Sequence, residues 1–206
     1  MCSSETEHEA GIFSLEDLTP IEELFPVVPS YEFVYCMQVR ATSQHVITQE
    51  APNFFPCKAI NPIIVKRKWT VTGTKEIKYS LMPGYVFLFS PERMDPSAFR
   101  ALDGVLKILQ YGFGEYALNA EDERVARWLL KYDGSLGLSR AYRIGDTIKV
   151  IDGPLADKLG TIEKMDWRRR RALVRFKFDG SDWTSWLDVD WTTPDSVKYN
   201  GLTESY

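Results

Sequence analysis

The clearest alternation of apolar and polar side chains lies toward the carboxyl end of the chain, in residues 171–178. Apolar side chains there alternate with mostly basic ones, Ala172, Val174, Phe176 and Phe178 against Arg171, Leu173, Arg175 and Lys177. This period of two predicts a strand with one buried face and one solvent face. Two shorter runs, at 147–151 and 161–165, are bounded by turn-forming glycines and predict two more strands. The sequence therefore predicts a small curled antiparallel sheet that presents cations to solvent.

Residues 33–131 show a different pattern, in which apolar runs are interleaved with helix-starting residues. Mostly apolar runs predict strands at 33–39, 59–69, 75–81, 82–89 and 105–110. Capping residues predict short helices at 42–49 and 95–102 and a longer one at 120–131, which Asn119 starts. The run 82–89 is so apolar that we expect both of its faces to be buried. Strands interleaved with helices and a hairpin give a compact α+β sandwich.

These patterns divide the 206 residues into five segments. They are an acidic extension (1–32), an α+β domain (33–132), a glycine-containing linker (133–143), a small β-barrel (144–193) and a tail (194–206). Apolar side chains make up 44% of the chain and aromatic ones 13%, which is enough for two small cores. No run of 18 apolar residues occurs and the amino terminus is acidic, so the sequence predicts neither a membrane span nor a secretory signal.

Charge is unevenly distributed along the chain. The formal net charge is −4, yet residues 1–33 contain eight acidic residues and no lysine or arginine. The rest holds 25 basic against 21 acidic residues, a formal charge of +4. A mildly basic body behind an acidic arm fits a nucleic-acid partner, although ordinary solvated surfaces also reach this charge. Composition alone leaves both interpretations open.

Two clusters of basic residues are candidates for nucleic-acid contacts. The first is the run Arg168, Arg169, Arg170 and Arg171 at a predicted turn, continued on the same sheet by Lys149, Arg175 and Lys177. The second is Lys66, Arg67 and Lys68, in a hairpin that we expect to turn at Thr72-Gly73-Thr74. Arginine suits phosphate and stacks on bases, and two tryptophans, Trp167 and Trp183, flank the first run. A solvated turn, solvated hairpin charge and buried tryptophans remain the alternatives.

The sequence lacks the usual signs of an enzyme or a metal protein. It contains no P-loop, zinc-binding pattern or Rossmann glycine run. Cys2, Cys36 and Cys57 have neither disulfide-framework nor metal-ligand spacing, so we expect a reduced, cytoplasmic protein without metal or cofactor. His45 and Cys57 are twelve residues apart with no orienting carboxylate motif, and nothing in this spacing makes a catalytic pair.

Two motifs, in a fixed order, resemble the NusG family of transcription elongation factors. The first is SLMPGYVFLFS at residues 80–90, which is similar to the Pro-Gly-Tyr-Val strand of the family's amino-terminal NGN domain. The second is GDTIKVIDGPLADKLGTI at 145–162, which is similar to the opening of the family's KOW domain. The likeness covers about residues 33–193. It implies an α+β chain, with an NGN-type α/β sandwich around an antiparallel sheet followed by a small SH3-like KOW β-barrel.

The resemblance implies a non-enzymatic factor that binds RNA polymerase through an apolar patch of the NGN domain. Carried over by position, this patch contains Tyr35 in the first strand, and Met82 and Tyr85 on either side of Pro83-Gly84. Burial in the core is the alternative for Tyr35 and Met82. Non-template DNA is a further candidate partner, because the family's NGN domain lies beside the transcription bubble. We expect a monomer in the cytoplasm, associated with the nucleoid through RNA polymerase and not with a membrane.

The KOW half departs from the housekeeping members of the family. Asp179 stands where those members carry a phenylalanine that helps to contact a ribosomal protein or the termination factor Rho. The arginine run is similar to the basic KOW domains of specialised paralogues such as LoaP, which promote processive antitermination and bind an RNA hairpin. The leading hypothesis is therefore a LoaP-like antitermination factor whose KOW domain contacts a nascent RNA hairpin. The alternatives are a housekeeping NusG that couples polymerase to Rho or the ribosome, and a KOW-containing, ribosome-associated RNA-binding protein.

Overall fold

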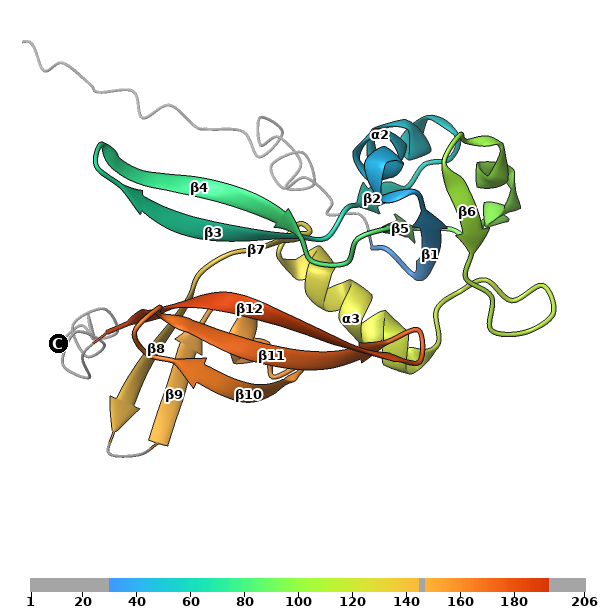
Figure 1. Ribbon diagram of the computed structural model, residues 1–206. Coiled ribbons are helices and arrows are strands. Elements are labelled where there is room, and N and C mark those ends of the chain that lie inside the picture. Colours follow the sequence, from blue (N-terminus) through green and yellow to red (C-terminus); the bar gives the residue numbers. More distant parts are fainter. Residues whose placement is uncertain (1–29, 145–146, 193–206) are drawn as a thin grey trace, which may run out of the picture. The chain divides into compact units, whose positions relative to one another are not determined.

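The computed structural model describes residues 30–144 and 147–192 (Figure 1). From Tyr31 onward these residues belong to one compact unit. Within that unit, residues 31–136 form the amino-terminal module and residues 139–192 the carboxy-terminal module, each with its own main sheet. Nearly all of the predicted acidic extension and the whole of the predicted tail lie outside the described residues.

The amino-terminal module is centred on a four-stranded antiparallel sheet in the order β2-β5-β1-β6. Its strands are β1 (Phe33–Val39), β2 (Lys58–Ile60), β5 (Tyr85–Ser90) and β6 (Val105–Ile108). The central strands β1 and β5 are mostly apolar, and the side chains of residues 86–89 in β5 have no exposed surface. The predicted burial on both faces is therefore confirmed for residues 86–89, whereas Pro83 is exposed and the strand begins only at Tyr85.

Two of the three predicted helices begin with the capping bonds that the sequence predicts. The side-chain oxygen of Asn119 accepts a hydrogen bond from the Asp122 N–H at 2.8 Å and starts α3 (Ala120–Lys131). The Asp95 carboxylate accepts a backbone N–H in the same way and starts η4 (Pro96–Ala101), which is a 3-10 helix. Ser43 precedes the third helix but makes no capping bond with its side chain. The remaining helices of this module are α2 (Gln44–Glu50), η2 (Ala41–Ser43) and η3 (Ala51–Asn53).

Two apolar clusters cover opposite faces of the four-stranded sheet, because successive side chains of a strand point to opposite sides. In β1, Val34 and Cys36 belong to one cluster, and Tyr35 and Met37 belong to the other. The first cluster contains the apolar side of α3, and the second contains buried residues of α2 and η4. Helices on both faces complete the predicted sandwich.

The predicted strand 59–69 is two strands in the structure, because Pro62 has no N–H to donate to a neighbouring strand. β2 pairs with β5, whereas β3 (Ile63–Thr70) pairs with β4 (Gly73–Ser80) in a long hairpin (Figure 1). Thr70 lies opposite Gly73, so the turn consists of Val71 and Thr72. The turn predicted at Thr72-Gly73-Thr74 is thus one residue too late.

Residues 133–143, predicted to be a linker, contain two strands. β7 (Ser135–Leu136) pairs in parallel with β3, and β8 (Ser139–Ile144) belongs to the second main sheet. Leu136 and Ser139 are fully buried. The glycine and serine content of this segment is typical of an exposed linker, so composition did not predict this burial. Two residues, Gly137 and Leu138, therefore lie between the strands of the two modules.

The carboxy-terminal module is a curled five-stranded sheet in the order β10-β11-β12-β8-β9 (Figure 1). Its further elements are β9 (Thr147–Asp152), the 3-10 helix η5 (Pro154–Asp157), β10 (Thr161–Asp166), β11 (Arg171–Phe178) and β12 (Ser181–Trp191). In β11 every second residue from Ala172 to Phe178 is buried, and Arg175 and Lys177 between them are exposed. The predicted α+β chain, with a small barrel-like second sheet, is confirmed.

Candidate nucleic-acid interface and the contact between the modules

The arginine run lies at the turn between β10 and β11, as predicted, and is exposed from Arg168 to Arg170. Asp166 accepts hydrogen bonds from the Arg169 backbone N–H at 3.0 Å and from Arg171 Nε at 3.3 Å. These bonds, the backbone one above all, lower the pKa of the Asp166 carboxyl group. Arg170 has a φ of 51°, a left-handed conformation that costs an L residue about 1–2 kcal/mol. Residues 168–170 are called the arginine turn below.

Cations on the strand face of β11 have acidic neighbours. Arg171 is paired with Asp166, and its guanidinium carbon lies 4.3 Å from the ring centroid of Trp186. Arg175 forms an ion pair with Glu163. Exposed ion pairs contribute little to stability, but they reduce the positive charge that a phosphate would meet. Among the described residues, Arg171 and Arg175 of β11 are therefore paired, whereas Arg168 and Arg169 of the arginine turn have no ion pair.

A hollow of about 390 Å³ brings the arginine turn together with the basic hairpin of the amino-terminal module. Its charged lining comes from both modules and consists of Arg67, Arg168, Arg169, Arg170, Asp188 and Asp190. The backbone N–H of Arg67 donates a hydrogen bond to Asp188 Oδ2 at 3.1 Å. Arg170 Nη1 lies 3.4 Å from Asp190 Oδ1. This space, called the arginine hollow below, unites residues from the two predicted basic clusters.

The other residues predicted to contact nucleic acid lie elsewhere. Lys149 lines a separate hollow of about 520 Å³ beside η5. Arg175 and Lys177 line a third hollow of about 490 Å³ beside α3. In the β3–β4 hairpin, Lys66 is half-buried and Lys68 is exposed. The predicted residues therefore do not form one continuous surface, and their contact with nucleic acid stays a prediction.

The three residues predicted to contact RNA polymerase do not share a surface. Tyr35 is 2% exposed in the cluster beside α2, and its hydroxyl oxygen accepts a hydrogen bond from the Met94 N–H at 3.1 Å. Met82 is fully buried and Tyr85 is half-buried, both in the cluster on the opposite face of the sheet. Packing within the fold accounts for each of these positions, so contact with polymerase stays a prediction for all three.

Tyr85 lies against the carboxy-terminal module. Its ring packs edge-on against Phe178 and Trp183, with ring centroids 5.6 Å and 5.5 Å away. Phe87, on the same face of β5, packs against Phe178 at 5.1 Å. Edge-to-face pairs of this kind contribute about 0.5–1.5 kcal/mol each beyond the area that they bury. The two modules therefore share one apolar cluster.

Asp179, at the position where the resemblance expects phenylalanine, joins the two modules by hydrogen bonds. It lies in the β11–β12 turn with a φ of 51°, a conformation that aspartate tolerates. Its backbone N–H donates to Asp122 Oδ1 at 3.0 Å, and its Oδ2 accepts from the Tyr85 hydroxyl at 3.3 Å and from Gln38 Nε2 at 3.4 Å. Burial, together with the nearby Asp179 charge, raises the pKa of Tyr85. Hydrogen bonds inside the protein thus offset the cost of desolvating this carboxylate.

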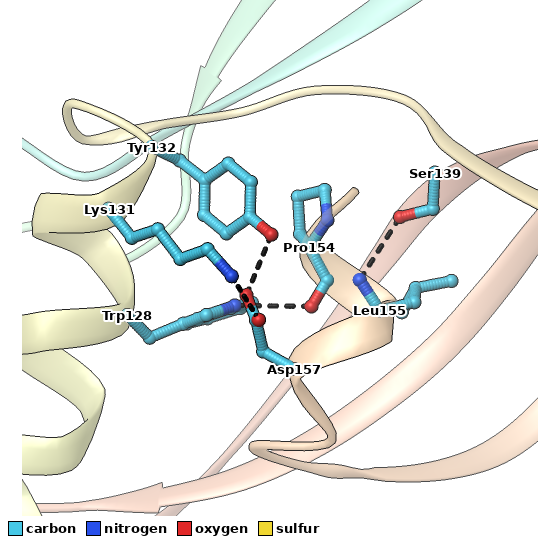
Figure 2. A network of polar contacts seen from close by, with 7 residues as sticks. All are labelled: Trp128, Lys131, Tyr132, Ser139, Pro154, Leu155 and Asp157. Atoms are coloured by element: carbon cyan, nitrogen blue, oxygen red, sulfur yellow. Dashed lines mark hydrogen bonds and ion pairs between the residues drawn. The ribbon is translucent and has the colours of Figure 1, made fainter. Parts of the chain in front are cut away.

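Figure 2 shows a second set of polar contacts between the modules, at the carboxyl end of α3. Trp128 Nε1 donates a hydrogen bond to the carbonyl oxygen of Pro154 at 3.1 Å. Asp157 accepts one from the Tyr132 hydroxyl at 2.7 Å and pairs with Lys131. Burial opposes ionisation of Asp157, yet these bonds hold the pKa of its carboxyl group below the ordinary value. η5 is therefore bound to the end of α3 through both backbone and side chains.

The Gly153-Pro154-Leu155 sequence has a structural role at this contact. Gly153 has a φ of 81°, and a Cβ there would lie 2.6 Å from the Leu138 carbonyl oxygen and from the Ser139 Cα. The Leu155 N–H donates to Ser139 Oγ at 3.1 Å (Figure 2). Both the backbone angle and the close approach of β8 therefore require glycine.

Sequence reasoning missed the polar residues that join the modules. An acidic first turn in α3 suits the helix dipole, and nothing in that pattern indicates that Asp122 bonds to Asp179. Tyr132 and Asp157 resemble ordinary surface residues in sequence. The one usable signal was the Gly153-Pro154 pair, because glycine permits positive φ and close backbone approach and proline suits the first position of a helix.

Neither cysteine in the described part of the chain is set up as a nucleophile. Burial raises the pKa of Cys57 to about 11 and that of Cys36 well above its ordinary value, so both thiols stay protonated at neutral pH. Within residues 30–144 and 147–192, no three His, Cys, Asp or Glu side chains gather so that they could hold a metal ion. No helix in these same ranges has the length and apolar character needed to cross a membrane.

The chain is similar to solved structures of known proteins. Neither a protein-family model nor a curated protein matches the chain. Among solved structures, the chain is similar to one described as domain interaction in Thermotoga maritima NusG, with a TM-score of 0.43 and 19% sequence identity. The match covers 76% of this chain and 93% of that chain.

Proposed function

We propose that this chain is a NusG-type transcription elongation factor of the specialised, antitermination kind. In this proposal the amino-terminal module binds RNA polymerase and the carboxy-terminal module holds a nascent RNA hairpin, so that the polymerase passes termination sites. The factor acts as a monomer, without cofactor or catalytic activity, in the cytoplasm and at the nucleoid through its polymerase. Non-template DNA is a further proposed partner, through the β3–β4 hairpin.

One observation carries this proposal: the motifs behind the resemblance fall where the fold requires their glycines. Gly84 precedes β5 with a φ of 84°, and a Cβ there would lie 3.0 Å from the Val39 carbonyl oxygen. Gly153 follows β9 in a similarly restricted position. The two motifs therefore occupy constrained turns in two different modules, which supports their interpretation as NGN and KOW motifs.

For RNA polymerase we propose the face of the four-stranded sheet that carries Tyr85. This ring is half-buried, whereas Tyr35 and Met82 lie inside the fold and support the sheet by packing. Phe178 and Trp183 pack against Tyr85 in the described arrangement. Contact with polymerase through Tyr85 therefore requires the two modules to separate.

Two features favour the antitermination form over the housekeeping form. The arginine turn is exposed and offers guanidinium groups, which match the geometry of phosphate. Asp179 is engaged with Tyr85 and Gln38 and offers no aromatic side chain. The contact that the resemblance assigns to Rho or to a ribosomal protein therefore lacks its phenylalanine.

The test is transcription past a terminator by purified RNA polymerase, with the full chain present or absent and with or without an operon leader upstream. We expect the chain to increase the fraction of transcripts that read through, and to increase it further on the template with the leader. A variant with Arg168→Ala and Arg169→Ala should still co-purify with polymerase but lose the leader-dependent part. Read-through that does not change when the wild-type chain is added would contradict the proposal.

A further inference from the structure

We infer that the arginine hollow is a single binding site for the phosphate backbone of a nucleic acid, built jointly by Arg67 of the hairpin and by the arginine turn. The choice of RNA as the physiological ligand rests on the proposed function. The site itself rests on the residues that line the hollow. In the docked arrangement this makes nucleic-acid binding a property of both modules together. Once the modules separate to expose Tyr85, the arginine turn alone remains to hold the ligand.

The first support is the way in which the two modules are joined at this place. Asp188 in β12 accepts a hydrogen bond from the backbone N–H of Arg67, so the bond does not occupy the Arg67 guanidinium. The Val189 N–H donates to the Arg170 carbonyl oxygen at 2.8 Å, which ties β12 to the arginine turn. Arg67 and the turn are therefore attached to two consecutive residues of β12, Asp188 and Val189.

The second support is the charge in the hollow. Four arginines and two aspartates line it, so its formal charge is positive. Asp188 is engaged by a backbone N–H and Asp190 by Arg170. Among the described residues, the side chains of Arg67 and Arg168 have no ion-pair partner, and a guanidinium without a carboxylate partner is free to bind phosphate through two parallel hydrogen bonds.

The third support is an aromatic surface beside the turn, which favours a nucleic acid over an acidic protein. Trp167 is 41% exposed and immediately precedes Arg168. Its ring packs against Trp191 at 4.4 Å, and the Arg143 guanidinium lies 5.2 Å from its centroid. Exposed aromatic rings next to cationic grooves are the usual means by which proteins bind unpaired bases. A strand whose phosphates occupy the hollow would have a base-stacking surface within reach.

The experiment compares binding of the full-length chain to a short fluorescein-labelled RNA stem-loop and to a DNA hairpin of the same sequence, by fluorescence anisotropy over a range of salt concentrations. Arg67→Ala keeps the backbone bond to Asp188, so its fold should survive. We expect it to weaken RNA binding by roughly tenfold near 0.1 M salt and to reduce the slope of log K against log salt by about 0.7–0.9. The control is Lys107→Ala, which removes one exposed positive charge of β6 that does not line the hollow and should change affinity less than about twofold.

A double-mutant cycle tests whether the hollow is one site. Arg168→Ala should weaken binding by a similar factor, and the combined variant should lose clearly less than the product of the two single losses, because both arginines contact the same stretch of backbone. Equal effects of Arg67→Ala and Lys107→Ala, or losses of the two arginine variants that simply multiply, would overturn the inference. Displacement of RNA by polyglutamate at lower concentration than by unlabelled RNA would also overturn it, in favour of an acidic protein. Tighter binding of RNA than of DNA identifies RNA as the ligand, and equal binding identifies the shared phosphate backbone.

Failure of this inference is distinguishable from failure of the proposed function. Co-purification with RNA polymerase and terminator read-through report on the function, and the anisotropy cycle reports on the hollow. If the wild-type chain alters read-through but the Arg67→Ala variant binds RNA normally, the inference about the hollow is overturned and the proposed function stands. A chain that binds RNA through both arginines but leaves transcription unchanged would overturn the proposed function alone.

Discussion

The indole N–H of Trp128 donates a hydrogen bond to the carbonyl oxygen of Pro154, at 3.1 Å and away from solvent. The donor belongs to α3 and the acceptor to η5, so this one bond joins the amino-terminal module to the carboxy-terminal module. Trp128 is 6% exposed, and its ring also packs against Phe176 with centroids 5.9 Å apart. Apolar packing and a directional bond therefore act at the same side chain.

Trp128→Phe should destabilise the chain by about 1–3 kcal/mol, because the Pro154 carbonyl would remain buried without this donor. The free energy of unfolding in urea measures the effect. Trp167→Phe is the matched control, since the Trp167 ring is 41% exposed and we expect a smaller loss there. Equal losses in the two variants would show that the bond to Pro154 contributes nothing.

Gly153→Ala should be far more damaging than Gly180→Ala. Both glycines have positive φ, 81° and 68°, so both substitutions introduce backbone strain of about 1–2 kcal/mol. A Cβ at Gly153 would also overlap the backbone of Leu138 and Ser139, whereas a Cβ at Gly180 meets nothing within 4 Å. We expect Gly153→Ala to lower the free energy of unfolding by about 3 kcal/mol or more. Similar melting temperatures for the two variants would contradict the close approach of β8.

Asp179 offers a test of polar docking. Asp179→Asn keeps a residue that tolerates positive φ and an oxygen that can accept from Tyr85 and Gln38, so its stability should stay within about 0.5 kcal/mol of the wild type. Asp179→Val loses both properties and should destabilise by about 2–3 kcal/mol. Thermal unfolding followed by circular dichroism distinguishes the pair. Equal stability of the Asn and Val variants would show that the Asp179 side chain does not stabilise the contact between the modules.

Acid should weaken the contact between η5 and α3. The pKa of Asp157 is lower in the folded chain than its ordinary value of about 3.9, so ionised Asp157 stabilises the fold above that pH. This contribution is lost as pH falls from about 4 through the folded-state pKa, because the unfolded chain takes up the proton first. Stability curves of the wild type and Asp157→Asn should therefore converge on acidification. Curves that stay parallel below about pH 4 would exclude Asp157 as the source.

Local chemistry made part of this structure predictable. The strand predicted at 33–39 is β1 at Phe33–Val39, because a short, mostly apolar run bounded by polar residues has to lie inside a sheet. The helix predicted at 120–131 is α3, because Asn119 satisfies one of its free N–H groups. The arginine turn was likewise predictable, since alternation identified the strand that follows it.

Contacts between distant residues explain what the sequence could not predict. Tyr35 lies opposite Leu88 and Tyr85 lies opposite Gln38, so the two tyrosines point to opposite faces of the sheet. This follows from strand register, which the alternation within each single strand does not determine. Asp122 and Asp179 are 57 residues apart and bond only because the modules pack together. Arg67 likewise lies beside the arginine turn only because the modules pack together.

The connection between the modules has a kinetic consequence. Only Gly137 and Leu138 separate β7 from β8, and β7 remains part of the sheet with β3. If the modules separate, this two-residue connection keeps them close together. Their re-docking is then a unimolecular step. A short tether of this kind gives an effective concentration on the order of millimolar. Any competitor for the Tyr85 face therefore has to bind it more strongly than the carboxy-terminal module does, and that module is held nearby by the covalent connection.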